Sequence, residues 1–415
     1  IGMLWTMLRR NDVVVLAWLT ALPLAGYVLL PKFGVTVLYN ARLLPYWYFG
    51  MYVFAGLALG LAVLEISRRV PLRDSVKIGL SLGTGLIVLV ATVLSIHDVP
   101  GWVKWNFEGY EGKADYAEYR TLMEAVDTLP PGRIMWEANN EMNKYGTPMA
   151  LMLFPYWSEG HPSMEGLFFE SSLTTPFHVL NASEVSEKPS NPVRGLNYRG
   201  FDMGRGIKHL AVYNVDYYVS YTEAGADAAR LEGLTQVGVA PPWTIFELPR
   251  SSLVDIATSE PAVWAGGGDF LDPALEWYDD VDNMDRWLVA DGPAGWKRVE
   301  AVDERLVAVE PVAGSGVVTD VVSEDHRISF TTSAVGVPHL VKVSYFPNWT
   351  AEGAEGPYRA APSLMVVVPT REQVVLEFRN TSAENVGMAL TLTALVGMGV
   401  YVYQRHRRRT GADAA

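Results

Sequence analysis

A histidine and two glutamates lie close together in the stretch SEGHPSMEGLFFESS, residues 158–172. His161, Glu165 and Glu170 are residue types that can hold a metal ion or transfer a proton between a substrate and solvent. Their spacing matches no standard metal motif, and loop carboxylates commonly hydrogen-bond the amides of turns. A catalytic set and a purely structural set are therefore both open for this stretch.

Two other groups of residues are of types that suit ligand binding. The acidic run DDVDNMD at residues 279–285 is typical of calcium loops. It lacks the central glycine and terminal glutamate of an EF-hand, which favours a solvated face. Trp349 and Tyr358 could stack on the faces of sugar rings, and core packing is the alternative role for both.

The elements that would position these residues begin with four apolar runs. A helix needs about 20 apolar residues to cross the hydrocarbon core of a bilayer, because lipid offers no partner for the backbone N–H and C=O groups. A buried core helix is the alternative for each run, but their length and lack of interior charge favour spanning. The runs cover residues 13–30, 46–66, 78–96 and 386–404.

Basic residues in the short flanking segments predict the orientation of these helices, because Lys and Arg mark the cytoplasmic side. The loop after the first run holds only Lys32 and Arg42. Both termini of this chain are therefore expected on the cytoplasmic side of a cell membrane, with residues 405–415 as a basic cytoplasmic tail. Residues 97–385 are expected on the outer side. The marking bases are Arg9, Arg10, Arg68, Arg69, Arg73, Lys77, Arg405, Arg407, Arg408 and Arg409.

The composition supports the same division. The chain has 415 residues, of which 49% are hydrophobic and 19% are charged. Residues 97–385 hold 42 acidic and 21 basic residues, whereas the rest of the chain holds 4 and 12. The acidic part argues against nucleic acid as a partner, because phosphate binding needs clustered Lys and Arg. The absence of cysteine excludes disulfides, a thiolate nucleophile and a Cys-ligated metal.

Three charged residues fall at the expected outer membrane surface. Arg42 is well placed for a lipid phosphate, and an interfacial arginine that only extends its head group to water is the alternative. Glu108 and Glu111 follow the third apolar run and could act as catalytic carboxylates. Solvated or structural carboxylates are the alternative for this pair.

The region 97–250 has the pattern of an α/β or α+β domain. Helical spacing runs over residues 115–129 and ends at Pro130-Pro131-Gly132. A second helix is expected over 204–213, with strands over 133–137, 216–221 and 243–248. Residues 139–200 show little periodicity and are expected to form a long loop region.

The region 251–385 changes to short alternating or β-branched runs separated by turn residues. This pattern is typical of an antiparallel β-sandwich, which would lead almost directly into the fourth apolar run. The expected strands are residues 317–322, 327–332, 340–346, 364–368 and 374–378.

Several motifs are distinctive: NARLLPYWYFGMYVFAG at residues 40–56, WVKWNFEGYEG with GRIMWE and MEGLFFESS, and YFPNWTAEGAEGPYRAAPSLMVVVP at residues 345–369. Together they resemble motifs of bacterial polytopic envelope proteins of the YfhO type, a group also named for a 6-pyruvoyl-tetrahydropterin synthase-related membrane domain. In the last of these, Tyr345, Pro347, Trp349 and Gly353 match the pattern YYPGWKA…DG of the group.

This resemblance implies an integral glycosyltransferase of the GT-C superfamily, which uses polyprenyl-phosphate sugars and an envelope glycan acceptor. Such enzymes carry their acidic catalytic residue in the first outer loop of a larger helix bundle. The chain begins with Ile1, and we expect it to be a C-terminal portion or a processed form that lacks this residue. The cofactor is unknown, with a divalent cation as the candidate.

Two functions follow from these expectations. The first is the C-terminal part of an envelope glycosyltransferase whose outer domain binds the acceptor or shapes the cleft. The second is a non-catalytic, membrane-anchored protein that binds or assembles envelope glycans. No motif within the chain itself establishes transfer chemistry.

Overall fold

The computed structural model describes residues 13–33, 40–69, 73–166, 172–282, 284–302, 312 and 316–412, with side chains up to residue 404. The chain forms two compact units, Ile1–Lys104 and Trp105–Ala415. The chain passes from the first to the second within the helix α5 (Asp98–Phe107).

The first unit is made of long apolar helices, as expected. Its elements are α2 (Val14–Leu29), η2 (Leu30–Phe33), η3 (Asn40–Leu43), α3 (Leu44–Arg69) and α4 (Asp74–Ser95). With α13 (Ser382–Ala412) of the second unit, the described residues contain four helices long and apolar enough to cross a membrane. The prediction of four such helices is confirmed.

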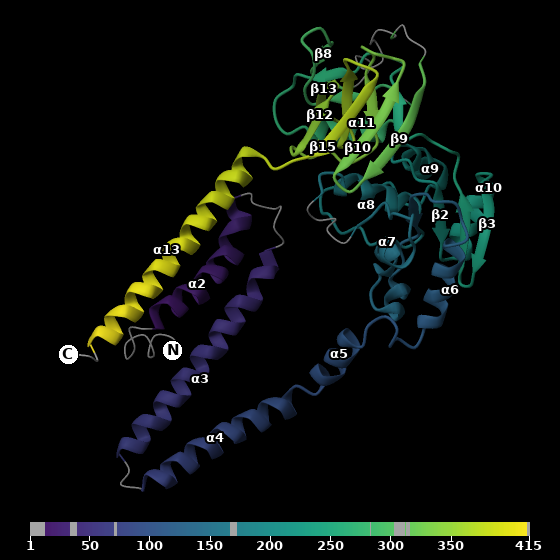
Figure 1. The fold of residues 1–415 in the computed structure, drawn as a ribbon. Helices are drawn as coiled ribbons and strands as arrows, with labels where there is room; N and C mark the ends of the chain where they lie inside the picture. The colour runs from purple at the N-terminus through teal and green to yellow at the C-terminus, as the bar shows by residue number, and fades with distance from the viewer. Residues whose placement is uncertain are drawn as a thin grey trace. The chain divides into compact units, whose positions relative to one another are not determined.

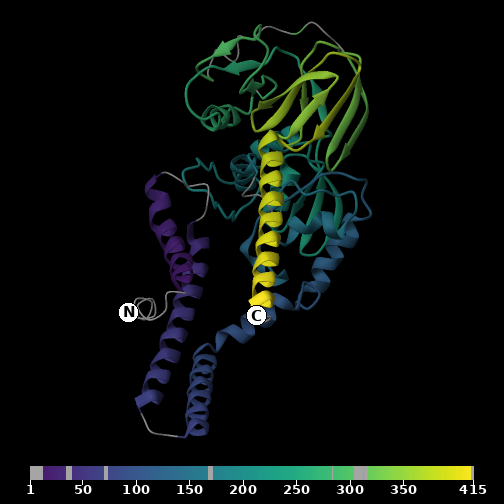
Figure 2. The same cartoon turned by 60° about the vertical axis from the view of Figure 1, so that its left-hand side comes forward.

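Helices α2 and α3 lie side by side in both views (Figures 1 and 2). Their contact depends on Gly50 of α3, because a Cβ placed there would lie 2.0 Å from Oγ1 of Thr20 in α2. Thr20 turns its hydroxyl inward along its own helix and donates to the Leu16 carbonyl at 2.8 Å. The glycine allows the two apolar helices to approach closely, and the threonine hydroxyl is already satisfied within its own helix. Such close packing holds helices together in a membrane, where no hydrophobic effect acts between them.

The second unit begins with a four-stranded mixed sheet in the order β1-β2-β4-β3. Strands β1 and β2 are parallel, and the other pairs are antiparallel. The elements of this part are α6 (Tyr116–Val126), β1 (Ile134–Trp136), η4 (Asn140–Tyr145), η5 (Ala150–Leu153), α7 (Phe154–Trp157), α8 (Thr175–Glu184), α9 (Met203–Val212), β2 (Tyr217–Ser220), α10 (Glu223–Leu231), β3 (Thr235–Ala240) and β4 (Trp243–Glu247).

Most of the expected elements of this part are confirmed, but the long loop over residues 139–200 is wrong. The structure places α8 and three shorter helical segments in that region. Helix α8 buries residues on every side, from Thr175 to Glu184, and therefore shows no amphipathic period in the sequence. Helix α9 was expected over 204–213 and is found one residue earlier, with Asp202 as its cap, accepting a hydrogen bond from the Arg205 amide at 3.1 Å.

The rest of the unit contains two facing sheets, as in a β-sandwich (Figure 1). The expectation of an antiparallel arrangement throughout is wrong, because β6 (Ala262–Trp264) pairs in parallel with both of its neighbours. One sheet has the order β12-β15-β10-β9, and the other has the order β5-β11-β14-β13-β7-β6-β8. The elements are β5 (Val254–Ile256), β6 (Ala262–Trp264), α11 (Leu271–Asp279), β7 (Leu288–Val289), β8 (Arg298–Val299), β9 (Val318–Glu324), β10 (Arg327–Thr332), β11 (His339–Val341), β12 (Trp349–Glu352), β13 (Ala354–Ala360), β14 (Leu364–Pro369) and β15 (Gln373–Phe378).

The sandwich core follows from strand alternation. In β10, Ile328 and Phe330 face inward, and in β15 Val374 and Leu376 do the same. These side chains are at most 2% exposed, and each contributes about 1.5–3 kcal/mol by leaving water. Strand β15 is followed after three residues by α13, the fourth apolar helix.

A second, larger core joins the two halves of this unit. It includes Met135 and Tyr218 of the mixed sheet together with Leu340 and Val366 of the seven-stranded sheet. A polar contact also joins these halves, because a guanidinium nitrogen of half-buried Arg133 donates to the Lys342 carbonyl at 3.3 Å. The division expected at residue 250 stays a prediction.

Candidate functional site

An apolar pocket of about 480 Å³ lies between α2 and the start of α3. It lies beside Pro23, a residue that cannot donate a backbone hydrogen bond and so leaves the Leu19 carbonyl outside the helical ladder. Thr20 and Gly50, which contact each other between the two helices, are both part of its lining. The lining residues are Leu16, Leu19, Thr20, Leu22, Pro23, Leu43, Tyr46, Phe49 and Gly50.

Two cations lie in the short turns that connect these helices. Lys32 belongs to η2, which continues α2, and Arg42 belongs to η3, which leads into α3; both side chains are exposed. Asn40 joins η3 to the C-terminal part of α2 by donating its side-chain amide to the Tyr27 carbonyl at 2.7 Å. The adjacent Leu43 lines the pocket itself. The arrangement therefore offers an apolar cavity for a hydrocarbon chain and basic groups in the turns that carry the chain from one lining helix to the other.

Glu108 and Glu111 differ in their surroundings. Oε1 of Glu108 lies 3.0 Å from Nζ of Lys113, and this ammonium also lies 4.0 Å from the centre of the Trp105 ring and donates to the Trp105 carbonyl. The Lys113 side chain is only 5% exposed, so the pair fixes the segment after α5. Glu111 is exposed on the same turn. Arg42 belongs to the other compact unit.

His161 is buried, with both ring nitrogens engaged. Nδ1 lies 2.9 Å from Oγ of Ser158, which donates to Asp127 at 2.5 Å, and Nε2 lies 3.1 Å from the Pro130 carbonyl oxygen. These contacts anchor the loop to the end of α6. His161 thus has no nitrogen turned toward a ligand among the described residues.

The structure describes only one of the two glutamates of the same stretch. Glu165 is half-buried, and burial raises the pKa of its carboxyl to about 7, which would suit a general acid. Glu170 lies outside the described residues. Within the described ranges, no group of three or more His, Asp or Glu residues has the geometry of a metal site.

The two aromatic candidates both pack against protein. Trp349 is 8% exposed in the sandwich core, and its ring meets Phe378 edge-on with centres 5.4 Å apart. Its ring is therefore covered by the two sheets instead of being presented to a sugar. Tyr358 is half-buried, and its ring lies 5.7 Å from that of Trp296 in an edge-on contact. Core packing, the alternative role, describes what both rings do here.

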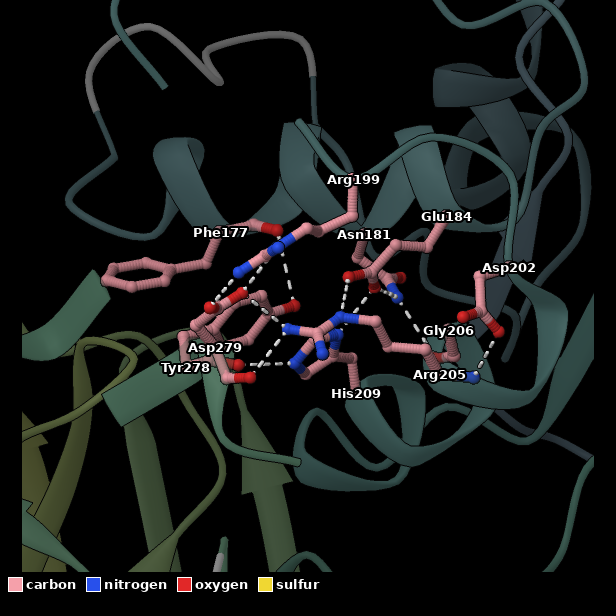
Figure 3. A network of polar contacts seen from close by, with 10 residues as sticks. All are labelled: Phe177, Asn181, Glu184, Arg199, Asp202, Arg205, Gly206, His209, Tyr278 and Asp279. Atoms are coloured by element: carbon pink, nitrogen blue, oxygen red, sulfur yellow. Dashed lines mark hydrogen bonds and ion pairs between the residues drawn. The ribbon is translucent and has the colours of Figure 1, made fainter. Parts of the chain in front are cut away.

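A buried polar network connects α8, α9 and α11 (Figure 3). Oε2 of Glu184 lies 2.5 Å from Nδ1 of His209, and Arg205 donates its Nε to Oε1 of Glu184 at 2.8 Å. Arg205 also donates to Oδ1 of Asp279 at 2.9 Å, and Figure 3 shows its guanidinium between the two carboxylates. Hydrogen bonding from Arg199 lowers the pKa of Asp279 below its ordinary value. The aspartates of the run 279–285 thus include one that pairs with arginine.

The hydrogen bonds of His209 settle its role. Its Nε2 lies 2.8 Å from the Tyr278 carbonyl oxygen, which can only accept, so this nitrogen carries a hydrogen. Nδ1 and Glu184 must then share one further proton, because two bare acceptors would repel at 2.5 Å. The imidazole also stacks on the Tyr278 ring, with centres 3.6 Å apart. Every polar side-chain atom of Glu184 and His209 has a partner within the protein. The network therefore has a structural role and holds the helices together.

Sequence reasoning missed this network because its members lie far apart in the chain. Glu184 falls in the region expected to be a loop, and Asp279 falls in a run that was expected to be a solvated face. The available signal was the spacing of Arg205 and His209, which are four residues apart on an expected helix and therefore share a face.

Comparison with protein-family models, with curated proteins and with solved structures gives no match for this chain.

Proposed function

We propose that this chain is a multi-pass bacterial membrane protein that binds a polyprenyl-phosphate-linked sugar between α2 and α3. It would be the C-terminal part of a GT-C-like, YfhO-type glycosyltransferase of the cell envelope. The observation that carries the proposal is the apolar pocket of about 480 Å³ together with Lys32 and Arg42 in the turns beside it. An isoprenoid chain matches the apolar walls, and its phosphate matches the cations.

The order of the helices supports an outward-facing position for this phosphate. If α2, α3, α4 and α13 each cross the bilayer once, the α2–α3 turn lies on the same side as residues 96–381. The basic residues Arg68, Arg69, Arg73 and Lys77 fall at the opposite ends of α3 and α4, which favours the cytoplasm for that side. The second unit would then lie outside the cytoplasm, where a glycan acceptor is available.

The second unit would bind the acceptor or shape the cleft. Among its candidate carboxylates, Glu108 is paired with Lys113, and Glu165, whose pKa burial raises to about 7, suits a general acid. The catalytic base is expected in an outer loop of a larger helix bundle. A divalent cation is the candidate cofactor for the leaving phosphate.

Transfer of a labelled sugar from a polyprenyl-phosphate donor tests the enzymatic proposal. The complete protein in lipid vesicles should transfer the label to envelope glycan, and Arg42→Gln should lower transfer mainly by raising the KM for the donor. Arg73→Gln removes the same charge at the other end of the helices and serves as the control. Unchanged donor KM in Arg42→Gln would reject the role of Arg42.

The alternative function, a non-catalytic anchored protein that binds or assembles envelope glycans, is favoured by one observation. His161 and the buried carboxylates of the second unit are satisfied internally among the described residues. Retained binding of envelope glycan by the whole chain, without any transfer by the complete protein, would support this alternative.

A further inference from the structure

We propose that the groove between the C-terminal end of α3 and the N-terminal end of α4 binds the phosphate head group of an anionic phospholipid. This inference concerns a different place from the pocket between α2 and α3. Helix α3 has 26 residues and is about 39 Å long, so its two ends reach opposite surfaces of a bilayer. The inference does not depend on glycosyl transfer.

The groove has a cavity of about 350 Å³ with an apolar wall. Leu64 of α3 and Ile78 and Leu82 of α4 form this wall. All three side chains are more than half exposed within the chain and would face acyl chains in a membrane. A free anion gains nothing from such a wall, whereas a lipid buries its first methylene groups against it.

Two cations lie on the groove from opposite helices, Arg68 from α3 and Lys77 from α4. The Lys77 side chain is 27% exposed and lies along the groove, whereas its carboxylate neighbour Asp74 is 95% exposed and 3.9 Å away. Arg68 approaches Glu65 only to 3.9 Å, because Glu65 pairs more closely with Arg69 at 2.9 Å. Both carboxylate contacts are at the long limit for an ion pair, so a phosphate placed between the two cations could approach them more closely than either carboxylate does.

Two hydroxyl groups complete the polar part of the groove. Ser67 and Ser81 line it from α3 and α4, one beside each cation. The Ser81 hydroxyl donates to the Lys77 carbonyl at 2.9 Å, and a hydroxyl can rotate to donate to a phosphate oxygen instead. Basic pockets between membrane helices are a recognised type of site for anionic lipid head groups. The combination of apolar wall, two cations and two hydroxyls matches phosphatidylglycerol better than phosphatidylcholine, whose own cation would meet Arg68 and Lys77.

Native mass spectrometry of the whole chain in detergent tests this site, with phosphatidylglycerol and phosphatidylcholine titrated separately. Phosphatidylglycerol should bind in preference. Each cation contributes an amount that corresponds to about fivefold in affinity, so Lys77→Gln should weaken binding about fivefold and Arg68→Gln/Lys77→Gln about 30-fold. Arg73→Gln is the matched control, because it removes one charge from the same hairpin without lining the groove, and it should change affinity less than twofold.

Ser81→Leu fills the groove without changing the charge and should also abolish preferential binding. Equal losses of phosphatidylglycerol affinity in Lys77→Gln and Arg73→Gln would overturn the proposal, because they would indicate a diffuse electrostatic attraction of the lipid to the basic hairpin. Competition by millimolar inorganic phosphate as effective as competition by the lipid would show an anion site without lipid selectivity, and would overturn it as well.

Discussion

Oε2 of Glu184 lies 2.5 Å from Nδ1 of His209, and both side chains are buried. This contact joins α8 to α9, and the His209–Tyr278 hydrogen bond continues it to α11. Two helices that precede residue 250 are thereby held to one that follows it. The relationship explains how a unit built from a mixed sheet and a sandwich behaves as one body.

Replacing Glu184 should destabilise this unit strongly. Glu184→Ala leaves His209 buried without its carboxylate and removes one of the two carboxylates that pair with Arg205, a change that typically costs about 3–5 kcal/mol. Urea unfolding of the whole chain in detergent, followed by tryptophan fluorescence, measures the loss. Asp282→Ala removes an exposed partner of Lys208 and should cost less than about 1 kcal/mol. Similar losses in the two variants would show that the buried network does not hold the helices together.

Glu165 should make stability fall as the pH rises. Burial raises the pKa of its carboxyl from 4.5 to about 7, so the folded state holds a proton that the unfolded state releases between these values. The contribution of this group to the free energy of unfolding is fully present below about pH 4.5 and is lost by about pH 7. The loss amounts to at most about 3 kcal/mol.

The difference between wild type and Glu165→Gln isolates this contribution. The variant should gain stability relative to wild type as the pH rises from 4.5 to 7, as measured by thermal unfolding at fixed buffer strength. Glu159→Gln changes an exposed carboxyl in the same loop and serves as the control. Parallel profiles for wild type and Glu165→Gln would contradict the prediction.

Gly50 should be intolerant of any side chain. Gly50→Leu places atoms where Thr20 already lies, and forced overpacking costs about 1–3 kcal/mol. The pair α2–α3 should separate, which double electron–electron resonance can measure between spin labels at Val28 and Tyr48, because the chain has no native cysteine. Gly56→Leu, on the same helix with open space around it, should leave the distance distribution unchanged. Equal distributions for the two variants would remove the basis for the pocket.

Sequence patterns predicted the elements whose residues alternate or repeat cleanly. Strand β10 was expected over 327–332 and is found there, because Ile328, Phe330 and Thr332 face inward between partly or fully exposed neighbours. Helix α8 gave no such pattern, since it is buried all round. Of the β3–β4 hairpin, only β4 was expected. Its turn contains Pro241 and Pro242, which interrupt the strand pattern between the two strands.

The candidate site was less accessible to sequence reasoning than the fold. Arg42 was expected to bind a lipid phosphate from its place beside an apolar run, but the pocket next to it depends on the packing of Thr20 against Gly50, which no periodicity reveals. Trp349 was expected either to stack on sugars or to fill the core, and only its strand pairing shows that it lies between the sheets.

The proposed orientation predicts which residues reagents can reach from outside a cell. A membrane-impermeant maleimide should label Lys32→Cys and Asn380→Cys in intact cells, because both positions lie at the expected outer surface. Arg73→Cys, between α3 and α4, should react only after the membrane is disrupted. Labelling of Arg73→Cys in intact cells, with Lys32→Cys protected, would reverse the topology and place the phosphate site inside.

The central claim is that a polyprenyl phosphate occupies the pocket between α2 and α3. A photoreactive polyprenyl-phosphate analogue, added to the whole chain in lipid vesicles and mapped by peptide mass spectrometry, tests it directly. We expect labelling within residues 16–23 or 43–50, reduced at least tenfold by Leu22→Trp, which fills the pocket, and little changed by Leu24→Trp, which does not line it. Labelling spread equally over α4 and α13, or equal labelling of the two tryptophan variants, would contradict the account.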